Sequence, residues 1–435
     1  MSIRLFRRPA FLGTALVFGI VSMTRAESYY FQDLGTLGGR KSAATAINNA
    51  GQVVGIADIT NSLYSHAVLF SGTGSNNIDL DLPGRVDYVG EAHGINDFGE
   101  IVGWSYTATG RYQPTVFGPA GKTILRDLCD SGLTSGECQA INNAGTIIGW
   151  ADDCDYIYES CNFSGANTNE TYLGSIGGGV SSAAYGINSY GLVVGLGNRE
   201  DGYGHAAAFG TGGNLDLGVL GGNSSQAYGI NDSNAIVGDS TIAGNSAFHA
   251  VLFSNTGISN FDLGTLGGYS SHAYAINNLG EIVGNSQTTT NDDSFHGFIY
   301  HNGVMKDLNN LVLPGSGISN IRFLYEGGDL PGRCINDLGQ IAAEGEVNGP
   351  THAILLTPVL RRLGVAIQGT NVIIKFDAVV GKTYRLEETA DFSHPNWQGL
   401  PGVPDYIATN TGPAQIAYVG GFNLSKAYYR VQLID

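Results

Sequence analysis

The sequence predicts an all-β protein: a seven-bladed β-propeller closed by its N-terminal strand, followed by a small C-terminal β-sandwich. Three observations support this prediction. A motif that begins with Ile-Asn occurs seven times, and five of its six spacings are 43 to 48 residues. Each unit holds four short apolar runs separated by turn residues, which is the content of one propeller blade. The first and last units are also incomplete in complementary ways.

The first 26 residues have the layout of a secretory signal peptide. Arg4, Arg7 and Arg8 form a basic start, residues 10–23 are an apolar run of 14, and residues 24–26 resemble a cleavage site. Fourteen apolar residues are too few to span a bilayer comfortably, although an uncleaved anchor is the alternative. We therefore expect a secreted chain without a membrane span, extracellular or at the cell surface, with the periplasm as a further location.

Residues 27–358 contain the repeat. In each unit an alternating strand ends at Ile-Asn, a turn that usually contains glycine follows, and a strand such as Ile-Val-Gly returns antiparallel. A third strand opens with His-Ala in four units and with His-Gly in a fifth, at His296, and a fourth strand carries Asp-Leu in most units. The Ile-Asn copies begin at Ile47, Ile95, Ile141, Ile187, Ile230, Ile276 and, in decayed form, Ile335. Seven such sheets in a ring bury their faces against one another.

The phase of the repeat predicts how the ring closes. The last unit ends at its third strand, residues 352–358, and no Asp-Leu strand follows it. The first Asp-Leu strand, residues 29–35, comes before the first Ile-Asn motif and has no unit of its own. Pairing the two completes the seventh blade. A parallel β-solenoid is the alternative, but its coils are usually shorter, about 20 to 30 residues.

These motifs resemble the HAF-repeat family of extracellular repeat proteins. The resemblance rests on "DLGTLGG" at Asp33 and Asp262, on the Ile-Asn motif, and on "HAVLF" at His66 and His249, and it covers most of residues 29–358. It implies a secreted repeat protein, and it brings no catalytic residues with it. The third unit departs most from the family pattern.

Residues 359–435 are expected to form a linker and a small β-sandwich module. Five short apolar runs follow one another here, and the motifs of the repeat do not occur among them. The module resembles the C-terminal sandwich modules of bacterial secreted proteins, through "YRLEETADFS" at Tyr384 and the closing "YYRV" at Tyr428.

The charge balance excludes two classes of partner. Of the 21 basic residues, four lie in the expected signal peptide, so 17 remain against 38 acidic residues and the mature net charge is −21. Nucleic acids and anionic membrane surfaces require a basic face, which this chain does not offer. We expect a monomer whose partner is a polysaccharide or an extracellular protein.

Candidate sites lie where the repeat is broken, above all in the third unit. Four acidic side chains there form a weak candidate calcium site, and a solvated acidic loop is the alternative: Asp152, Asp153, Asp155 and Glu159. Four cysteines at short spacings are candidates for disulfides in an oxidising compartment: Cys129 with Cys138, and Cys154 with Cys161. Cys334 is left over. A second irregularity is the long segment 313–334 in the seventh unit, which we expect to project from one end of the ring.

Two further metal patterns are weaker. The five repeated histidines would occupy equivalent places in the ring, but a residue repeated blade by blade usually serves the blade itself. "DLDLPG" at Asp79 is close to a calcium loop, yet Pro83 occupies a ligand position, so we dismiss it.

No familiar catalytic motif is present, neither a GxSxG elbow, an HExxH helix nor a phosphate-binding loop. The sequence therefore favours a secreted, non-enzymatic binding scaffold without a cofactor. The alternative is an extracellular polysaccharide hydrolase or lyase, which would need two carboxylates about 5 to 10 Å apart in a pocket.

Overall fold

The computed structural model shows a nearly all-β chain with no α-helix among the residues that it describes. These are residues 3–4 and 28–433, without the following segments: 61–63, 73, 82–88, 107–110, 119–120, 126–134, 153–156, 164–170, 211, 255–256, 258, 291–293, 314, 325–331, 359–362, 369–370, 379–382, 390–397, 400–402, 408–411 and 420–427. The chain divides into two units, Phe31–Leu356 and the remainder, and each is described by itself.

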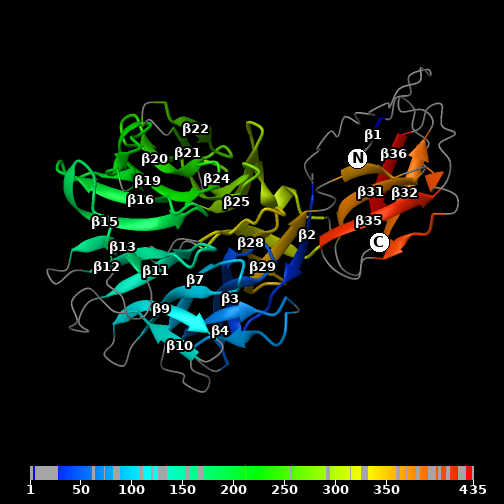
Figure 1. The fold of residues 1–435 in the computed structure, drawn as a ribbon, viewed down its shortest axis with the longest axis horizontal. Coiled ribbons are helices and arrows are strands. Elements are labelled where there is room, and N and C mark those ends of the chain that lie inside the picture. The colour runs from blue at the N-terminus through cyan, green and yellow to red at the C-terminus, as the bar shows by residue number, and fades with distance from the viewer. Residues whose placement is uncertain are drawn as a thin grey trace. The chain divides into compact units, whose positions relative to one another are not determined.

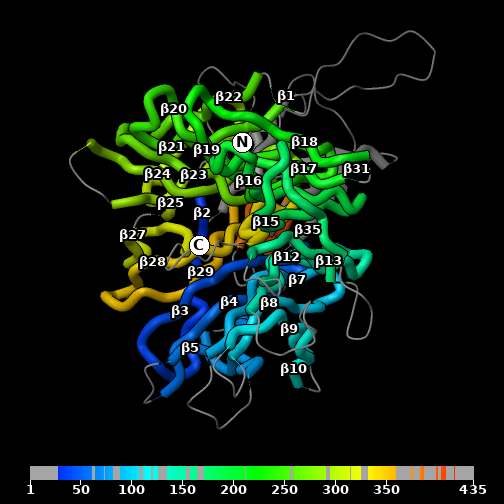
Figure 2. Tube along the Cα trace, turned by 90° about the vertical axis from the view of Figure 1, so that its left-hand side faces the viewer, coloured from blue at the N-terminus to red at the C-terminus, as the bar shows by residue number. Residues whose placement is uncertain are grey.

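The larger unit is a seven-bladed β-propeller, as predicted. Its seven four-stranded antiparallel sheets follow one another round a ring (Figure 1). In Figure 2 the colours pass in chain order round the ring, and the yellow strands return beside blue β3. Within blades 1 to 6 the first strand in the chain is innermost, so the other three strands lie further from the axis.

The strands of the blades are as follows. Blade 1 holds β3 (Gly38–Ile47), β4 (Val53–Ile59), β5 (Ser65–Phe70) and β6 (Ile78–Asp79); blade 2 holds β7 (Gly90–Ile95), β8 (Ile101–Tyr106), β9 (Tyr112–Gly118) and β10 (Gly121–Ile124). Blade 3 holds β11 (Gly136–Ile141), β12 (Ile147–Asp152), β13 (Tyr158–Phe163) and β14 (Thr171–Tyr172); blade 4 holds β15 (Gly178–Ile187), β16 (Val193–Arg199), β17 (Gly204–Phe209) and β18 (Leu215–Asp216). Blade 5 holds β19 (Gly221–Ile230), β20 (Ile236–Ile242), β21 (Phe248–Phe253) and β22 (Phe261–Gly264); blade 6 holds β23 (Ser271–Ile276), β24 (Ile282–Gln287), β25 (Phe295–His301) and β26 (Val304–Asp307), followed by a 3-10 turn, η1 (Leu308–Asn310). Blade 7 holds β27 (Ile318–Arg322), β28 (Ile341–Val347), β29 (Thr351–Pro358) and the N-terminal β2 (Tyr29–Asp33).

The core of the propeller lies between neighbouring blades. Val54 and Ala67 of blade 1 pack against Ile101 and Phe117 of blade 2, and all four are buried. Equivalent apolar clusters join blade 2 to blade 3, blade 3 to blade 4, blade 4 to blade 5, and blade 5 to blade 6. A further cluster joins blade 7 to blade 1. The ring therefore buries a layer of apolar side chains at its closure as it does elsewhere.

The closure pairs the first strand with the last, as the phase of the repeat predicts. In blade 7, β2 lies beside β29, and Leu34 N–H donates to the carbonyl of Ala353 at 2.9 Å. The same bond occurs inside blade 4, where Leu217 N–H donates to the carbonyl of Ala206 at 2.9 Å. The closing blade thus repeats the backbone pairing of an interior blade.

The innermost strand of each blade leaves no room for a side chain at the glycine of the Ile-Val-Gly strand. In blades 1 to 6 the innermost strand carries a β-bulge, and a backbone carbonyl beside the bulge points at this glycine. A Cβ on Gly149 would lie 1.9 Å from the carbonyl oxygen of Glu137, and one on Gly284 would lie 1.9 Å from that of His272. Any side chain at this position would therefore displace the backbone of its neighbour.

Blade 7 explains why its own copy of the motif has decayed. The innermost strand of blade 7 is made of two separate chain segments. Arg322 of β27 pairs with Glu344, and after an insertion in the chain Ile335 pairs with Ile341. Ala343 stands where the other blades have glycine, opposite the gap between these two pairings, and it is fully buried. The expectation that the whole segment 313–334 projects from the ring was wrong in part, since Ile318–Arg322 forms a paired strand.

The smaller unit contains the predicted C-terminal strands. One sheet has the order β30 (Leu363–Gln368), β31 (Asn371–Ala378) and β35 (Gly412–Val419). The other has the order β1 (Ile3–Arg4), β36 (Tyr428–Leu433), β32 (Thr383–Thr389) and β33 (Gln398–Gly399), and β34 (Tyr406–Ile407) also pairs with β32. Phe376 of the first sheet contacts Tyr384 of the second, with ring centroids 5.1 Å apart, and both are buried. Trp397 lies outside the described residues.

Candidate functional site

The asparagine of each Ile-Asn motif serves two turns at once. Its Oδ1 accepts backbone N–H groups of its own turn; for Asn142 these come from Ala144 and Thr146, each at 3.0 Å. Its Nδ2 donates to the backbone carbonyl of the equivalent asparagine in the next blade. The seven bonds run from Asn48 to Asn96, Asn142, Asn188, Asn231, Asn277, Asn336 and back to Asn48, at 2.9 to 3.3 Å.

This buried asparagine ring explains why the residue recurs in every copy. All seven asparagines are at most 5% exposed, and each satisfies backbone groups that would otherwise be buried unpaired. The bond from Asn336 to Asn48 at 3.0 Å joins the last blade to the first. The ring surrounds the central channel at the end where the Ile-Asn turns lie.

The residue after each ring asparagine builds a second, more exposed ring, which we call the Asx rim. Its members are Asn49, Asp97, Asn143, Ser189, Asp232, Asn278 and Asp337. In six of the seven blades the backbone N–H donates to a side-chain oxygen of the next member, at 2.8 to 2.9 Å. Among the described residues the missing bond is the one from Asn143 to Ser189.

The order of residues in the rim alternates amide with carboxylate. Asn278 Nδ2 donates to Asp232 and to Asp337, each at 3.0 Å, and Asn49 Nδ2 donates to Asp337 and Asp97, each at 3.2 Å. A ring of seven members cannot alternate throughout, because seven is odd. Ser189 lies at the place where the alternation must fail, between Asn143 and Asp232.

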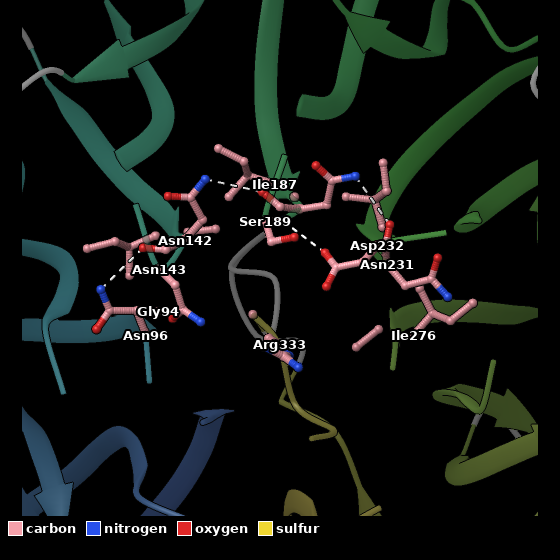
Figure 3. A pocket seen from close by; sticks show the side chains of 18 of the residues that line it. Gly94, Asn96, Asn142, Asn143, Ile187, Ser189, Asn231, Asp232, Ile276 and Arg333 are labelled. Atoms are coloured by element: carbon pink, nitrogen blue, oxygen red, sulfur yellow. Dashed lines mark hydrogen bonds between the residues drawn. The ribbon is translucent and has the colours of Figure 1, made fainter. Parts of the chain in front are cut away.

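Arg333 supplies the positive charge of the rim. Its guanidinium lies 3.3 Å from a carboxylate oxygen of Asp337, and it also donates to Asn49 Oδ1 at 3.5 Å. Figure 3 shows it alone near the centre of the ring, opposite Ser189 and Asp232. The backbone beside it crosses towards blades 1 and 2, because Ile47 N–H donates to the Arg333 carbonyl at 2.9 Å and Gly332 lies against the His93 carbonyl.

Two of the rim carboxylates, Asp97 and Asp232, have lowered pKa values. Burial alone would raise the pKa of Asp97, but hydrogen bonds from Asn143 and Asn49 and the charge of Arg333 outweigh it and lower the pKa. Asp232 behaves in the same way: burial opposes, but hydrogen bonds from Ser189 and Asn278 and the charge of Arg333 hold its pKa below the usual value. With three aspartates and one arginine, the rim carries a net negative charge.

A cavity of about 170 Å³ lies inside the Asx rim. Its lining includes the rim, Arg333 and the small residues Gly94 and Gly186 of the innermost strands (Figure 3). Tyrosines and isoleucines of the innermost strands, such as Tyr228, line it as well. Outside the rim, the next residue of several turns is a large exposed side chain: Phe98, Tyr190 and Leu279, of which the first two are 76% and 79% exposed. The channel mouth thus combines a polar rim with partly apolar walls and an exposed apolar margin.

The repeated histidines do not form a metal ring. Each donates through Nδ1 to an aspartate on the outermost strand of its own blade: His66 to Asp79, His205 to Asp216, His249 to Asp262, His296 to Asp307 and His352 to Asp33, at 2.8 to 3.0 Å. The innermost and second strands lie between these pairs and the axis. The pair His352–Asp33 fastens β29 to β2 at the closure, so the histidines serve their blades.

One of these pairs belongs to a larger ionic group. His66, Asp79 and Asp81 place ligand atoms within 4.8 Å of one another. Asp79 and Asp81 belong to the "DLDLPG" stretch that the sequence analysis dismissed as a calcium loop. Lys122 Nζ lies 3.1 Å from Asp81 Oδ1, and Ala67 N–H donates to Asp81 Oδ2 at 3.1 Å. The lysine already supplies the cation that the two carboxylates attract, so we interpret this group as an ion-pair network.

The predicted site of the third unit is described only in part. Asp152, at the end of β12, is buried, and Glu159, in β13, is half-buried, whereas Asp153 and Asp155 lie outside the described residues. Cys138 and Cys161 are buried in the cluster between blades 2 and 3, and their proposed partners Cys129 and Cys154 also lie outside. The calcium site and both disulfides therefore stay predictions. Cys334 is a buried free thiol whose pKa is raised by burial.

No family model matches the chain, and no curated protein matches it. Within the part of the chain that the structure describes, no helix is long and apolar enough to cross a membrane. The site is therefore interpreted from its own geometry. The sequence pattern contained the Asx rim in its "INN", "IND" and "INS" copies, but Arg333 carried no signal because it follows an insertion in the least regular unit.

Proposed function

We propose that this chain is a secreted binding scaffold of the HAF-repeat type, and that the channel mouth binds one sugar unit of an extracellular polysaccharide. The observation that carries the proposal is the 170 Å³ cavity inside the Asx rim. A cavity of about 150 Å³ holds a benzene molecule, so this one suits a single six-membered ring rather than a folded partner. A chain end or a branch would enter along the axis.

The chemistry of the mouth suits hydroxyl groups. A carboxylate offers about four acceptor positions, so Asp97 and Asp232 keep acceptor capacity beyond the bonds that they make in the rim. The positions of Asp337 are taken by Asn49, Asn278 and Arg333. Ser189 and the backbone N–H of Asn143 add a hydroxyl and a donor at the break in the ring. The exposed rings of Phe98 and Tyr190 offer apolar faces to the C–H surfaces of sugars outside the cavity.

Hydrolysis is the less favoured reading of the same site. Asp232 and Asp337 both accept from Asn278, so their oxygens lie within the range of separations that glycoside hydrolases use. Such an enzyme needs one protonated carboxyl as general acid. The pKa values of Asp97 and Asp232 are lowered, so neither holds a proton at neutral pH, and binding is the better use of this arrangement.

A polysaccharide pull-down with variants of the margin tests the proposal. The double variant Phe98→Ala/Tyr190→Ala removes exposed apolar surface at the mouth, and we expect it to lose most of the retention of the parent chain. Phe261→Ala/Tyr269→Ala removes the same two ring types outside the mouth, where they are 55% and 60% exposed, and serves as the control. Equal retention of the two variants would contradict the proposal, and shortening of the polymer would replace binding with hydrolysis.

A further inference from the structure

The strand ends furthest from the Ile-Asn turns carry a second group of side chains in blades 2 and 3. Five aromatic rings form a continuous series there: Trp104, Tyr106, Tyr112, Trp150 and Tyr158. Trp104 and Trp150 take the position directly after the Ile-Val-Gly glycine, where other blades have Ile56, Leu196, Asp239, Asn285 or Glu344. The rings at this position are therefore particular to blades 2 and 3 and are not part of the repeat.

Three of the rings meet as walls at an angle. Tyr112 and Trp150 have centroids 6.0 Å apart and planes inclined by 76°. Trp150 and Tyr158 are 4.9 Å apart and inclined by 62°. Tyr158 is 49% exposed, and Tyr112 and Trp150 are half-buried, so the corner that these rings form is open to solvent.

Carboxylates stand beside these walls. Glu137 lies directly opposite Trp150 across β11 and β12, and Asp152 lies directly opposite Tyr158 across β12 and β13. Because side chains alternate along a strand, Trp150 and Asp152 share a face, and their cross-strand neighbours share it with them. Glu137 and Asp152 are both 7% exposed. Burial and the charges of Glu137 and Asp152 raise the pKa of Tyr112 to about 12, which agrees with carboxylates close to that ring.

Few basic groups lie near this corner in the part of the chain that the structure describes. Lys122 of β10 is engaged by Asp81 at the border with blade 1, on the other side of blade 2. Arg111 precedes Tyr112 and is half-buried. A third carboxylate, Glu91, lies opposite Trp104 across β7 and β8. His93 Nε2 lies 3.2 Å from a carboxylate oxygen of Glu91. Among the described residues the carboxylates beside the rings still outnumber the basic groups, so the corner favours a positive ligand.

We propose that the corner formed by Tyr112, Trp150 and Tyr158 binds an alkylammonium group. The negative faces of aromatic rings attract a cation, most strongly over tryptophan, and quaternary ammonium ligands are recognised by such walls. Glu137 and Asp152 add an attraction that a neutral ligand of the same shape would lack. The site is separate from the channel mouth and does not depend on the function proposed for it.

Choline chloride is the probe, and 3,3-dimethylbutanol is its neutral isostere. Trp397→Phe leaves Trp104 and Trp150 as the only tryptophans, so the fluorescence of that protein reports on the site. We expect choline to change the emission with a saturable titration and to bind at least about tenfold more tightly than the isostere, the factor that 1.4 kcal/mol provides. Equal titrations with the two compounds would overturn the proposal.

Substitutions separate the site from the rest of the ring. Tyr158→Ala removes an exposed wall and is expected to weaken choline binding at least about tenfold at unchanged thermal stability. Tyr203→Ala removes an exposed ring of blade 4 and should leave the binding unchanged. Unaltered binding in Tyr158→Ala, or equal losses in both variants, would contradict the assignment.

The same chemistry occurs on soluble molecules and on phosphocholine headgroups. Co-sedimentation with phosphatidylcholine vesicles, with and without free choline as competitor, distinguishes the two sources. Vesicle binding that choline displaces assigns the headgroup, and choline binding without vesicle binding assigns a soluble ligand. Failure of both would refute the site while leaving the channel mouth untested by this experiment.

Discussion

Replacing Asn336 by alanine tests whether the asparagine ring is closed. Asn336 is fully buried and makes four hydrogen bonds: Nδ2 donates to the Asn48 carbonyl at 3.0 Å and to Gln340 Oε1 at 2.9 Å, while Oδ1 accepts from the N–H groups of Leu338 and Gln340. A typical bond contributes about 1 kcal/mol net, and a partner left unpaired costs about 1 to 3 kcal/mol. We expect a loss of about 3 kcal/mol, after local water replaces part of the lost bonding.

Asn277 is the matched control for this substitution. It makes the same four types of bond, but its Nδ2 reaches the next blade along the chain, at the Asn336 carbonyl. In a closed ring the two positions are equivalent, so Asn277→Ala and Asn336→Ala should lower the free energy of unfolding in urea by similar amounts. In an open array Asn336 would lie at an end. Asn336 would then lack only the bond to the Asn48 carbonyl and keep its three local bonds, so a loss at Asn336 smaller than that at Asn277 by about 1 kcal/mol or more would refute the closed ring.

Three further predictions concern the rim and the repeat. Ser189→Asn should complete the Asx rim by accepting the N–H of Asn143, and should raise the free energy of unfolding by about 1 kcal/mol. Ser189→Ala should lower it by up to about 1 kcal/mol, because the side chain also hydrogen-bonds Asp232. No gain with asparagine would mean that the gap is not a missing bond. Arg333→Ala should raise the pKa values of Asp97 and Asp232, which Arg333 helps to lower. Because a lowered carboxyl pKa contributes stability that is lost as the pH falls through it, the variant should begin to lose stability at a higher pH than the parent chain, and coincident acid-unfolding curves would contradict this. Gly284→Ala should cost about 3 kcal/mol or prevent folding, since its Cβ would meet the His272 carbonyl, whereas Ala343→Gly should cost about 1 kcal/mol; equal effects in thermal unfolding would contradict the explanation of the decayed copy.

The fold could be predicted from the sequence because the same four-strand pattern occurs seven times. Hydrophobic alternation and turn residues gave the four strands of each blade, and the unpaired strand at Asp33 gave the closure. The same repetition revealed which residues recur without revealing what each one does. The motif predicts Asn142 to be a turn residue, and its hydrogen bonds within the turn confirm this. Its bond to the Asn188 carbonyl could not be predicted, because that bond depends on the distance between two blades. That distance is a property of the closed ring.

The candidate sites were harder to predict because they depend on contacts between blades. Arg333 reaches the Asx rim only because the chain re-enters the ring after the insertion in the seventh unit. Trp150 and Tyr112 are separated by 38 positions and come from different blades, so no local pattern joins them. The sequence analysis singled out the third unit through its acidic residues and cysteines, and it did not use the aromatic rings there.

The measurement that tests the closed ring most directly is a distance across its joint. Spin labels at Ala50→Cys and Leu338→Cys would report on blades 1 and 7, and labels at Phe98→Cys and Ala144→Cys would report on the neighbouring blades 2 and 3. All four residues occupy the same position in their Ile-Asn turns. The closed propeller predicts that pulsed electron paramagnetic resonance gives similar distances for the two pairs. A distance between residues 50 and 338 several times longer than that between residues 98 and 144 would show an open array, and neither the channel mouth nor its rim would then exist.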